Sequence, residues 1–325
     1  MRIPYLYAIC SFAFLLSGPP AHAQTDAYPS RPVTILIPFA AGGNTEFEYR
    51  PYAIKLTENV GRPFILDFKA GAGTLIGTTY VAKAPPDGYL LLGASSSYAA
   101  LPSLYPDLPY DPNKDLTAVS IMTTKASVLV IHPSLPASTM REFIAYARAN
   151  PDKINQSTPG AGGAPHLRSL QLYNLIGVTP TFIHYKGTGP LVTDLMAGRV
   201  NVAITGLPTV ASQLKSGKLR VIATTGRERM ALLPDIPTVA ESGVPDYEFS
   251  GWGAMLAPGG TPAPIVNRLS AELAKVAKAP DIIQRFRQEG WQMVGSTPEE
   301  ARRWIASEIE FTRNLVKQTG LKLEQ

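Results

Sequence analysis

The sequence has 325 residues, of which 45% are hydrophobic and 17% charged, with a formal net charge of +5 at pH 7. This length allows two domains with sizeable cores. The basic residues are scattered, which excludes the positively charged runs that bind nucleic acid or anionic membranes. The one cysteine, Cys10, lies in the N-terminal apolar segment, so the rest of the chain has no disulfide, thiolate metal site or cysteine nucleophile.

Residues 1–23 are typical of a secretory signal peptide. They contain a positive charge at Arg2, an apolar run over residues 5–16, and an A-x-A cleavage site at residues 21–23. The apolar run is short for a helix that spans a bilayer, and a signal anchor is the alternative. We expect cleavage after Ala23 and export of the mature chain to the periplasm.

Short apolar runs then alternate with helix-like segments. The runs predict strands at Val33–Pro38, Phe64–Leu66, Leu90–Gly93, Ala118–Met122, Val128–His132, Val200–Ile204 and Leu219–Ala223. Helical patterns occur at Thr74–Lys83, Thr139–Asn150, His166–Leu175 and Val192–Ala197. This alternation predicts an α/β fold of mostly parallel sheets flanked by helices on both faces.

The pattern after Leu256 changes to mostly helix, with segments at Pro262–Lys278, Pro280–Glu289 and Pro298–Thr319. Each begins near Thr-Pro or Ala-Pro, and proline is favoured at the first position of a helix.

The first predicted strand leads through a glycine turn into a helix. Gly42 and Gly43 allow a tight turn, and Asn44 or Thr45 is a suitable N-cap. The exposed N–H groups of such a helix start suit a phosphate or a carboxylate. An ordinary strand-to-helix turn is the alternative interpretation. Glu46 either points away from a bound anion or contacts a donor group of the ligand.

Five loops rich in Gly, Ser or Thr follow predicted strands, at Ala41–Thr45, Gly71–Thr74, Ala94–Tyr98, Thr158–His166 and Lys186–Pro190. Singly, each is typical of a plain turn. Together they favour one shared site at the carboxyl ends of the strands. The fourth loop opens a helix, so a second helix N-terminus facing the first would form a two-sided anion clamp.

Other chemistries fit the sequence less well. The segment Gly71–Gly77 resembles a dinucleotide-binding turn, but its third glycine is one position late and no acidic partner follows. Gly93–Ser97 lacks the second glycine of a nucleophile elbow. The histidines have no metal-type spacing. His166, at the start of a predicted helix, either hydrogen-bonds within its loop or meets a ligand.

As a set, the motifs resemble the Bug-type proteins, which are periplasmic solute-binding components of tripartite tricarboxylate transporters. The motifs are Tyr28–Pro32, Pro38–Gly43, Gly71–Gly73, Ala82–Ala84, Pro86–Tyr89, Leu108–Pro112, Ala164–Leu167, Tyr185–Gly187, Gly217–Arg220, Leu233–Thr238, Leu256–Pro258 and Thr297–Glu300. The resemblance implies a two-domain Venus-flytrap fold of the type II periplasmic binding class, with two crossing segments as a hinge. It also implies that the loop after the first strand and the Gly/Ser loop of the second domain hold ligand carboxylates through N–H groups, hydroxyls and water.

We therefore expect domain I to comprise residues 24–126 and 250–325, and domain II residues 127–249. The candidate ligand-binding residues are Phe39, Ala41, Gly42, Gly43, Asn44, Thr45, Glu46, Ser96, Thr158, Gly162, Gly163, His166, Gly187 and Thr205.

The sequence departs from the family pattern at four positions. The family commonly has Asp in place of Glu46, often Ser in place of Gly163, and often Asp in place of Thr205. Pro51 stands early in a helix that normally has no proline there, and it is expected to kink or shorten that helix. The residues that select the distal part of the ligand are therefore expected to differ.

The resulting functional prediction is a binding protein that closes on a small carboxylate and delivers it to the membrane permease subunits of a transporter. No catalysis, cofactor or nucleic-acid partner is expected, and a monomer is the default. One alternative is a ligand-sensing subunit that docks to a membrane receptor such as a sensor kinase. Another is a secreted α/β hydrolase that uses Ser96 and His166. Which carboxylate is bound stays open.

Overall fold

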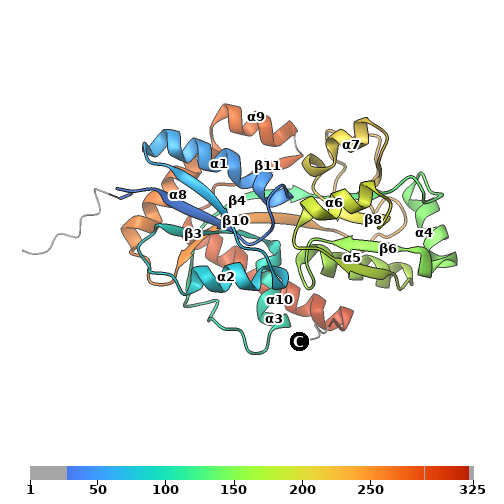
Figure 1. Ribbon diagram of the computed structural model, residues 1–325, viewed down its shortest axis with the longest axis horizontal. Coiled ribbons are helices and arrows are strands. Elements are labelled where there is room, and N and C mark those ends of the chain that lie inside the picture. The colour runs from blue at the N-terminus through green and yellow to red at the C-terminus, as the bar shows by residue number, and fades with distance from the viewer. Residues whose placement is uncertain (1–27, 289, 322–325) are drawn as a thin grey trace, which may run out of the picture.

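The computed structural model describes residues 28–288 and 290–321. The predicted signal peptide lies outside these residues. The described chain forms two lobes side by side, each built on its own sheet (Figure 1).

The first lobe contains a six-stranded sheet in the order β11-β4-β10-β3-β1-β2. Its strands are β1 (Val33–Ile37), β2 (Phe64–Phe68), β3 (Leu90–Ser95), β4 (Leu116–Ala126), β10 (Ser250–Pro258) and β11 (Trp291–Met293). Its helices are α1 (Asn44–Val60), α2 (Leu75–Ala82), α3 (Leu101–Leu104), α8 (Ala263–Ala277), α9 (Pro280–Gln288) and α10 (Pro298–Thr319).

The second lobe contains a five-stranded sheet in the order β7-β6-β8-β5-β9. Its strands are β5 (Val128–Ile131), β6 (Asn155–Thr158), β7 (Thr181–His184), β8 (Val202–Thr205) and β9 (Arg220–Thr224). Its helices are α4 (Met140–Ala149), α5 (Ala164–Ile176), α6 (Thr188–Met196) and α7 (Ala211–Lys215).

The predicted two-domain α/β fold class is confirmed, with a correction to the strand directions. Both sheets are mixed rather than mostly parallel. β1 pairs in parallel with β2 and β3, and β6 with β7 and β8. The other pairings are antiparallel, and each involves β4, β5 or β10. β4 and β5 carry the chain from the first lobe to the second, and β10 carries it back.

Helix α1 is anchored in the first lobe by buried tyrosines. The Tyr49 hydroxyl lies 2.7 Å from the carbonyl oxygen of Ala94 and 2.6 Å from that of Ala254, which fixes α1 over β3 and β10. Pro51 lies inside α1, yet the helix continues to Val60, so the expected shortening is wrong.

Thr225 joins the two segments where the chain passes between the lobes. Its hydroxyl accepts a hydrogen bond from the N–H of Ser127 at 2.8 Å and lies 2.7 Å from the carbonyl oxygen of Phe249. Its main chain also pairs with both residues. The Thr225 side chain is fully buried, so both crossings are held against the second lobe at one point.

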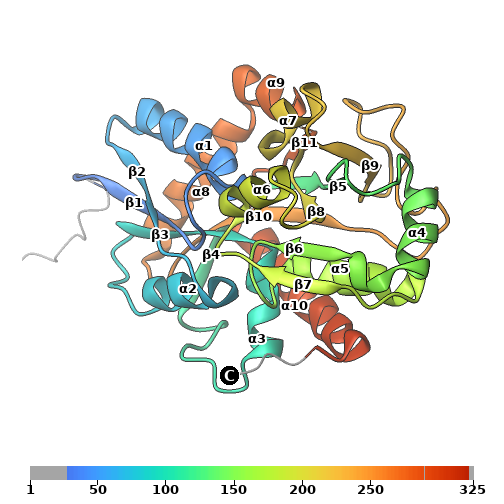
Figure 2. The same cartoon turned by 45° about the vertical axis from the view of Figure 1, so that its right-hand side comes forward.

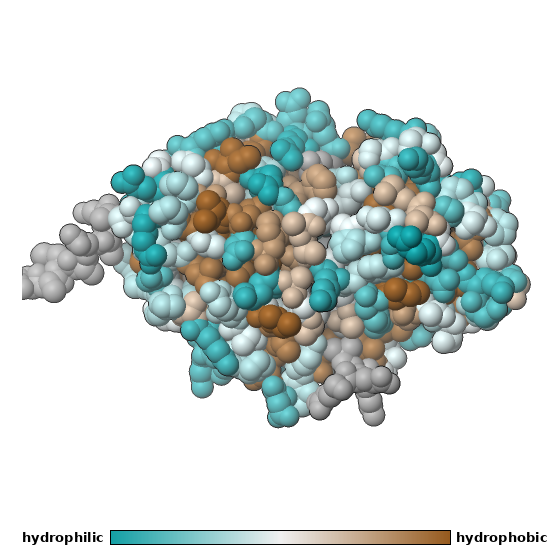
Figure 3. Space-filling view, viewed as in Figure 1, coloured by the Kyte–Doolittle hydropathy of each residue, from teal (hydrophilic) through white to brown (hydrophobic). Residues whose placement is uncertain are grey.

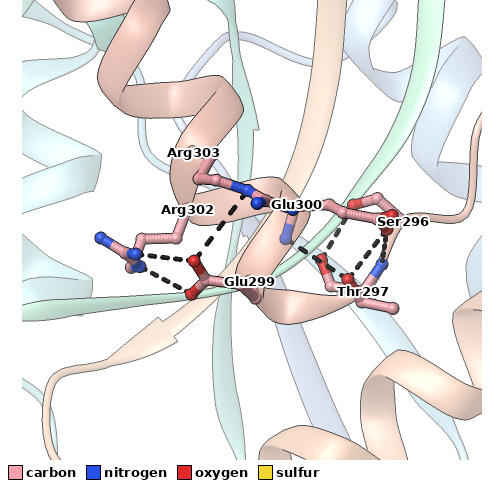
Figure 4. A network of polar contacts seen from close by, with 6 residues as sticks. All are labelled: Ser296, Thr297, Glu299, Glu300, Arg302 and Arg303. Atoms are coloured by element: carbon pink, nitrogen blue, oxygen red, sulfur yellow. Dashed lines mark hydrogen bonds and ion pairs between the residues drawn. The ribbon is translucent and has the colours of Figure 1, made fainter.

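Helix α10 belongs to the first lobe and also contacts the second. It begins with a capping box, in which Thr297 and Glu300 exchange side-chain and backbone hydrogen bonds (Figure 4). This start matches the predicted helix at Pro298. Further along, Leu315 packs in one buried cluster with Leu167 of α5, and α10 lies beside α5 in both ribbon views (Figure 2).

Hydrophobic residues on the face drawn in Figure 3 gather mainly over the first lobe. The exposed large hydrophobic side chains of the first lobe include Ile65 on β2, and Ile76 and Tyr80 on α2. Within residues 28–288 and 290–321, every helix is too short or too polar to cross a membrane.

Candidate functional site

A cavity of about 60 Å³ lies between the lobes. This volume exceeds the space that one water molecule needs. The first lobe lines it with Phe39, Gly43, Asn44, Thr45, Ser95, Ser96, Ser97, Lys125 and Gly251. The second lobe and the crossing segments line it with Ser127, Pro159, Pro165, Thr188, Ile204, Thr205, Gly206 and Phe249. The wall is therefore rich in hydroxyl groups, with Phe39, Ile204 and Phe249 as large apolar contacts.

The loop after β1 presents the N-terminus of α1 to this cavity. The N-cap is Gly43, without a side-chain cap, rather than Asn44 or Thr45 as predicted. Asn44 and Thr45 occupy the first two helical positions, where N–H groups have no acceptor within the helix. These donors and the helix dipole favour a bound anion at this end of the cavity.

Glu46 stabilises the loop and does not line the cavity. Its carboxylate accepts a hydrogen bond from the N–H of Gly42 at 2.6 Å and pairs with the guanidinium of Arg50. Burial by itself would raise the pKa of Glu46, but the Gly42 hydrogen bond and Arg50 together lower it. Of the two roles expected for Glu46, this geometry matches pointing away from a ligand.

The N-terminus of α5 differs from the predicted second arm of an anion clamp, because the N–H groups of Gly162, Gly163 and Ala164 already have acceptors. The N–H of Ala164 donates to the Ser97 hydroxyl at 3.1 Å, across the two lobes. Pro165 has no N–H group. The N–H of Gly162 donates to Nδ1 of His166 at 3.0 Å.

His166 is accordingly bound within its own loop. Its side chain is 4% exposed and packs edge-on against His184 and Phe182, with ring centroids 4.5 and 4.7 Å away. Burial, and to a lesser extent His184, lowers the pKa of His166 to about 3. The ring is therefore neutral at physiological pH and shapes the loop as a hydrogen-bond acceptor.

The second lobe supplies a helix N-terminus that the sequence analysis placed too late. Helix α6 begins at Thr188, four residues before the predicted Val192, and Thr188 lines the cavity. A Cβ at Gly43 would lie 3.4 Å from the Thr188 nitrogen. The N–H of Ala40 also donates to the carbonyl oxygen of Lys186 at 2.8 Å. The loop after β1 therefore contacts the start of α6 directly.

Six of the fourteen candidate residues line the cavity. They are Phe39, Gly43, Asn44, Thr45, Ser96 and Thr205. The other eight, Ala41, Gly42, Glu46, Thr158, Gly162, Gly163, His166 and Gly187, lie outside its lining. Several of these shape the neighbouring loops: Thr158, for example, has its hydroxyl 2.7 Å from Nδ1 of His184.

Lys125, which the sequence analysis missed, is the one charged residue in the lining that the described chain provides. It is 8% exposed and forms an ion pair with Glu48 of α1, which is fully buried. Thr123 also donates to the Glu48 carboxylate. The Lys125 ammonium lies 4.7 Å from the ring centroid of Trp291. A buried pair of this kind is held by the contacts that replace water around each charge.

A second contact between the lobes lies beside the cavity. A Cβ at Gly73 would stand 2.4 Å from the carbonyl oxygen of Ala161, so the two glycine-rich loops touch through their backbones. Thr74, next in the chain, has a φ of 97°, which is rare for a β-branched residue.

These features define a two-lobed binding protein with a hydroxyl-bearing cavity between its lobes. Comparisons with known proteins identify the family. The model for the tripartite tricarboxylate transporter family receptor, TctC, matches residues 49–321, and the chain belongs to this family.

Individual relatives agree along nearly the whole chain. Protein BugT of Bordetella pertussis is 35% identical, with all of both chains covered. The structure of the periplasmic binding protein BugD has 32% identity and a TM-score of 0.88, covering 91% of this chain and all of that one. The structure of R. palustris Rpa4515 with adipate has 32% identity and a TM-score of 0.87, covering 91% and 99%. The predicted membership of the Bug-type family is confirmed.

Proposed function

We propose that this protein captures a small carboxylate between its lobes in the periplasm and delivers it to the permease subunits of a tripartite tricarboxylate-type transporter. The observation that carries the proposal is the cavity between the lobes at the N-terminus of α1. There, N–H groups without helical acceptors and the helix dipole favour one carboxylate. Adipate in the relative Rpa4515 supports the ligand class.

We also propose that domain I comprises residues 24–126 and 250–325 and domain II residues 127–249, a division that the two separate sheets of the described residues support. Ligand binding would shift an equilibrium between open and closed forms by its differential affinity for the closed one. We also propose that residues 1–23 direct export to the periplasm and are cleaved after Ala23, and the similarity to BugD, a periplasmic binding protein, supports this location.

A binding role is favoured over hydrolysis. A serine hydrolase needs a nucleophile within reach of a base, but the His166 nitrogen that faces its loop accepts from Gly162. The candidate nucleophile Ser96 lines the cavity, whereas His166 lies outside the lining. The two residues of the hydrolase alternative therefore do not meet in this cavity.

The test is a thermal-shift screen of the mature chain, unfolded and refolded to remove carried-over ligand. The probes are short monocarboxylates and dicarboxylates, with the corresponding amides as uncharged controls. A ligand at about one hundred times its dissociation constant should add about 2.7 kcal/mol to the stability. Shifts with acids but not with amides are expected. No shift with any acid would refute carboxylate capture.

A variant locates the site. Gly43→Val should reduce the affinity for the best acid by at least about tenfold, because a branched side chain at the tightly packed α1 start would displace the Thr188 backbone. Calorimetric titration measures the affinity. Wild-type affinity in the folded variant would show that the ligand does not bind at the N-terminus of α1. Co-purification of the ligand-saturated protein with permease subunits tests delivery, and capture of a sensor kinase in their place would favour sensing.

A further inference from the structure

The buried ion pair at the cavity wall bears on ligand class, and the argument rests on the proposed function. Lys125 supplies the only cationic side chain that lines the cavity within the described residues. Its charge is already matched by Glu48, which is fully buried one layer behind it. The pair therefore adds no net charge to the site.

The remaining charge of the site is small. A helix N-terminus corresponds to roughly half a positive charge, which suits one carboxylate. Glu46 and Arg50 beside this helix also form a pair and stand outside the lining. Lys186 lines an adjoining groove but is exposed, so solvent and salt screen its charge. A second buried carboxylate would be left largely uncompensated.

The hydrogen-bonding capacity of Lys125 favours a ligand hydroxyl over a second carboxylate. An ammonium has three N–H donors, and Lys125 uses its ammonium to pair with Glu48 and to face the Trp291 ring. A ligand hydroxyl can accept from an ammonium without bringing a second negative charge. Asn44 also lines the cavity, with its Oδ1 packed against Gly206, where a Cβ would lie 2.0 Å from that oxygen.

The positions of these groups fit one short ligand. Asn44 and Glu48 are four residues apart on α1, so they lie on one face about 6 Å apart along the axis. Lys125, held by Glu48, therefore stands about one helical turn from the anion-binding N–H groups.

We propose that the Glu48–Lys125 pair makes this protein selective for small monocarboxylates that carry an uncharged hydroxyl, in preference to dicarboxylates of the same length. Glu48 acts as a specificity-determining residue through Lys125. It cancels the charge that a second carboxylate would need and leaves the ammonium as a hydrogen-bond donor.

The experiment compares matched acids by calorimetric titration at one ionic strength. The pairs are γ-hydroxybutyrate with succinate, δ-hydroxyvalerate with glutarate, and ε-hydroxycaproate with adipate. In the wild-type protein the best hydroxy acid should bind at least about tenfold more tightly than its matched diacid, because the second carboxylate is buried without a counter-charge. Diacids that bind equally well or better would overturn the inference while leaving carboxylate capture intact. Absence of binding by both series and by all other acids of the thermal-shift screen would refute the proposed function and this inference with it.

Two variants assign the effect to the pair. Glu48→Gln removes the carboxylate that balances the Lys125 charge. The ratio of the affinity for the hydroxy acid to that for its matched diacid should therefore fall by at least about tenfold. An unchanged preference in the folded variant would overturn the role of Glu48. The double variant Glu48→Gln/Lys125→Met avoids an unpaired buried charge. It should lose about tenfold in affinity for the hydroxy acid and gain nothing for the diacid. Unchanged affinity for the hydroxy acid would exclude the ammonium as its donor.

Discussion

Gly73 is the residue at which a single methyl group should interfere most directly with closure of the lobes. Its backbone approaches Ala161 of the second lobe so closely that an added Cβ would lie 2.4 Å from the Ala161 carbonyl oxygen. Ordinary contacts of this kind are about 3.5 Å. Gly73→Ala therefore requires the two loops to separate by about 1 Å, and this separation opens the cavity beside them.

The expected loss of affinity follows from the cost of this overlap. Overpacking by one methyl group costs about 1–3 kcal/mol, and here the cost applies only to the closed form. The affinity for the best carboxylate should thus fall about 5- to 140-fold. A separate cost arises because Gly73 has a φ of 59°, which destabilises alanine by about 1–2 kcal/mol in both open and closed forms.

Gly61→Ala is the matched control. Gly61 has a φ of 71°, and a Cβ there would meet no atom within 4 Å. Both variants should lose a similar amount of stability in urea titration, but only Gly73→Ala should lose affinity in calorimetric titration. X-ray scattering of the ligand-saturated proteins should show the more open shape for Gly73→Ala alone. If Gly73→Ala binds its ligand within about twofold of Gly61→Ala, the contact with Ala161 does not limit closure.

Three further predictions concern stability. Thr74→Gly should raise the free energy of unfolding by about 1 kcal/mol, because a β-branched residue at a φ of 97° is strained; an unchanged urea midpoint would contradict this strain. Burial lowers the pKa of His166 from its usual 6.5 to about 3, so the unfolded chain binds the proton first and stability is lost as the pH falls below 6.5, by about 2 kcal/mol at pH 5. His166→Asn should lack this part of the pH dependence measured by urea titration at several pH values, and an identical slope would exclude His166 as its source. Thr225→Val should lower the free energy of unfolding by about 1–3 kcal/mol, because the Ser127 N–H loses its buried acceptor. In the same assay the control Thr193→Val, which removes an exposed hydroxyl, should leave the free energy of unfolding nearly unchanged. Equal losses in the two variants would argue against a special role for Thr225.

The parts of the fold that could be predicted from the sequence are those whose signal is local. The strand Val33–Ile37 and the turn into α1 follow from a short β-branched run and two glycines. The start of α10 follows from Thr297 and Glu300. In each case a few neighbouring residues determine the structure, so periodicity and capping rules are sufficient.

Other elements depend on distant partners. β10 was not predicted because Ser250–Pro258 contains glycines and a proline that are typical of turns, yet it is buried between β3 and β4. Gly253 is needed there, since a Cβ would overlap the Glu48 carboxylate. β6 was missed because its residues are polar, although the Ser157 hydroxyl finds an acceptor in the carbonyl oxygen of Val202.

The candidate site shows the same division. The glycine turn and Thr45 could be located from a strand–turn–helix pattern, and they do line the cavity. Lys125 could not, because its partner Glu48 is 77 residues away and a lone lysine at a strand end is usually exposed. The commitment of the α5 donors to Ser97 and His166 likewise depends on tertiary contacts.

The attachment of both crossing segments to Thr225 has a consequence for any partner that meets the closed protein. Because Ser127 and Phe249 are tied to the same residue, both crossing segments leave the second lobe at one point, and this attachment would restrict the relative motion of the lobes largely to rotation about it. Ligands of different length would then end in nearly the same outer shape. A partner that docks on that shape would register that a ligand is present and not which one, so the choice among solutes would have to be made inside the cavity.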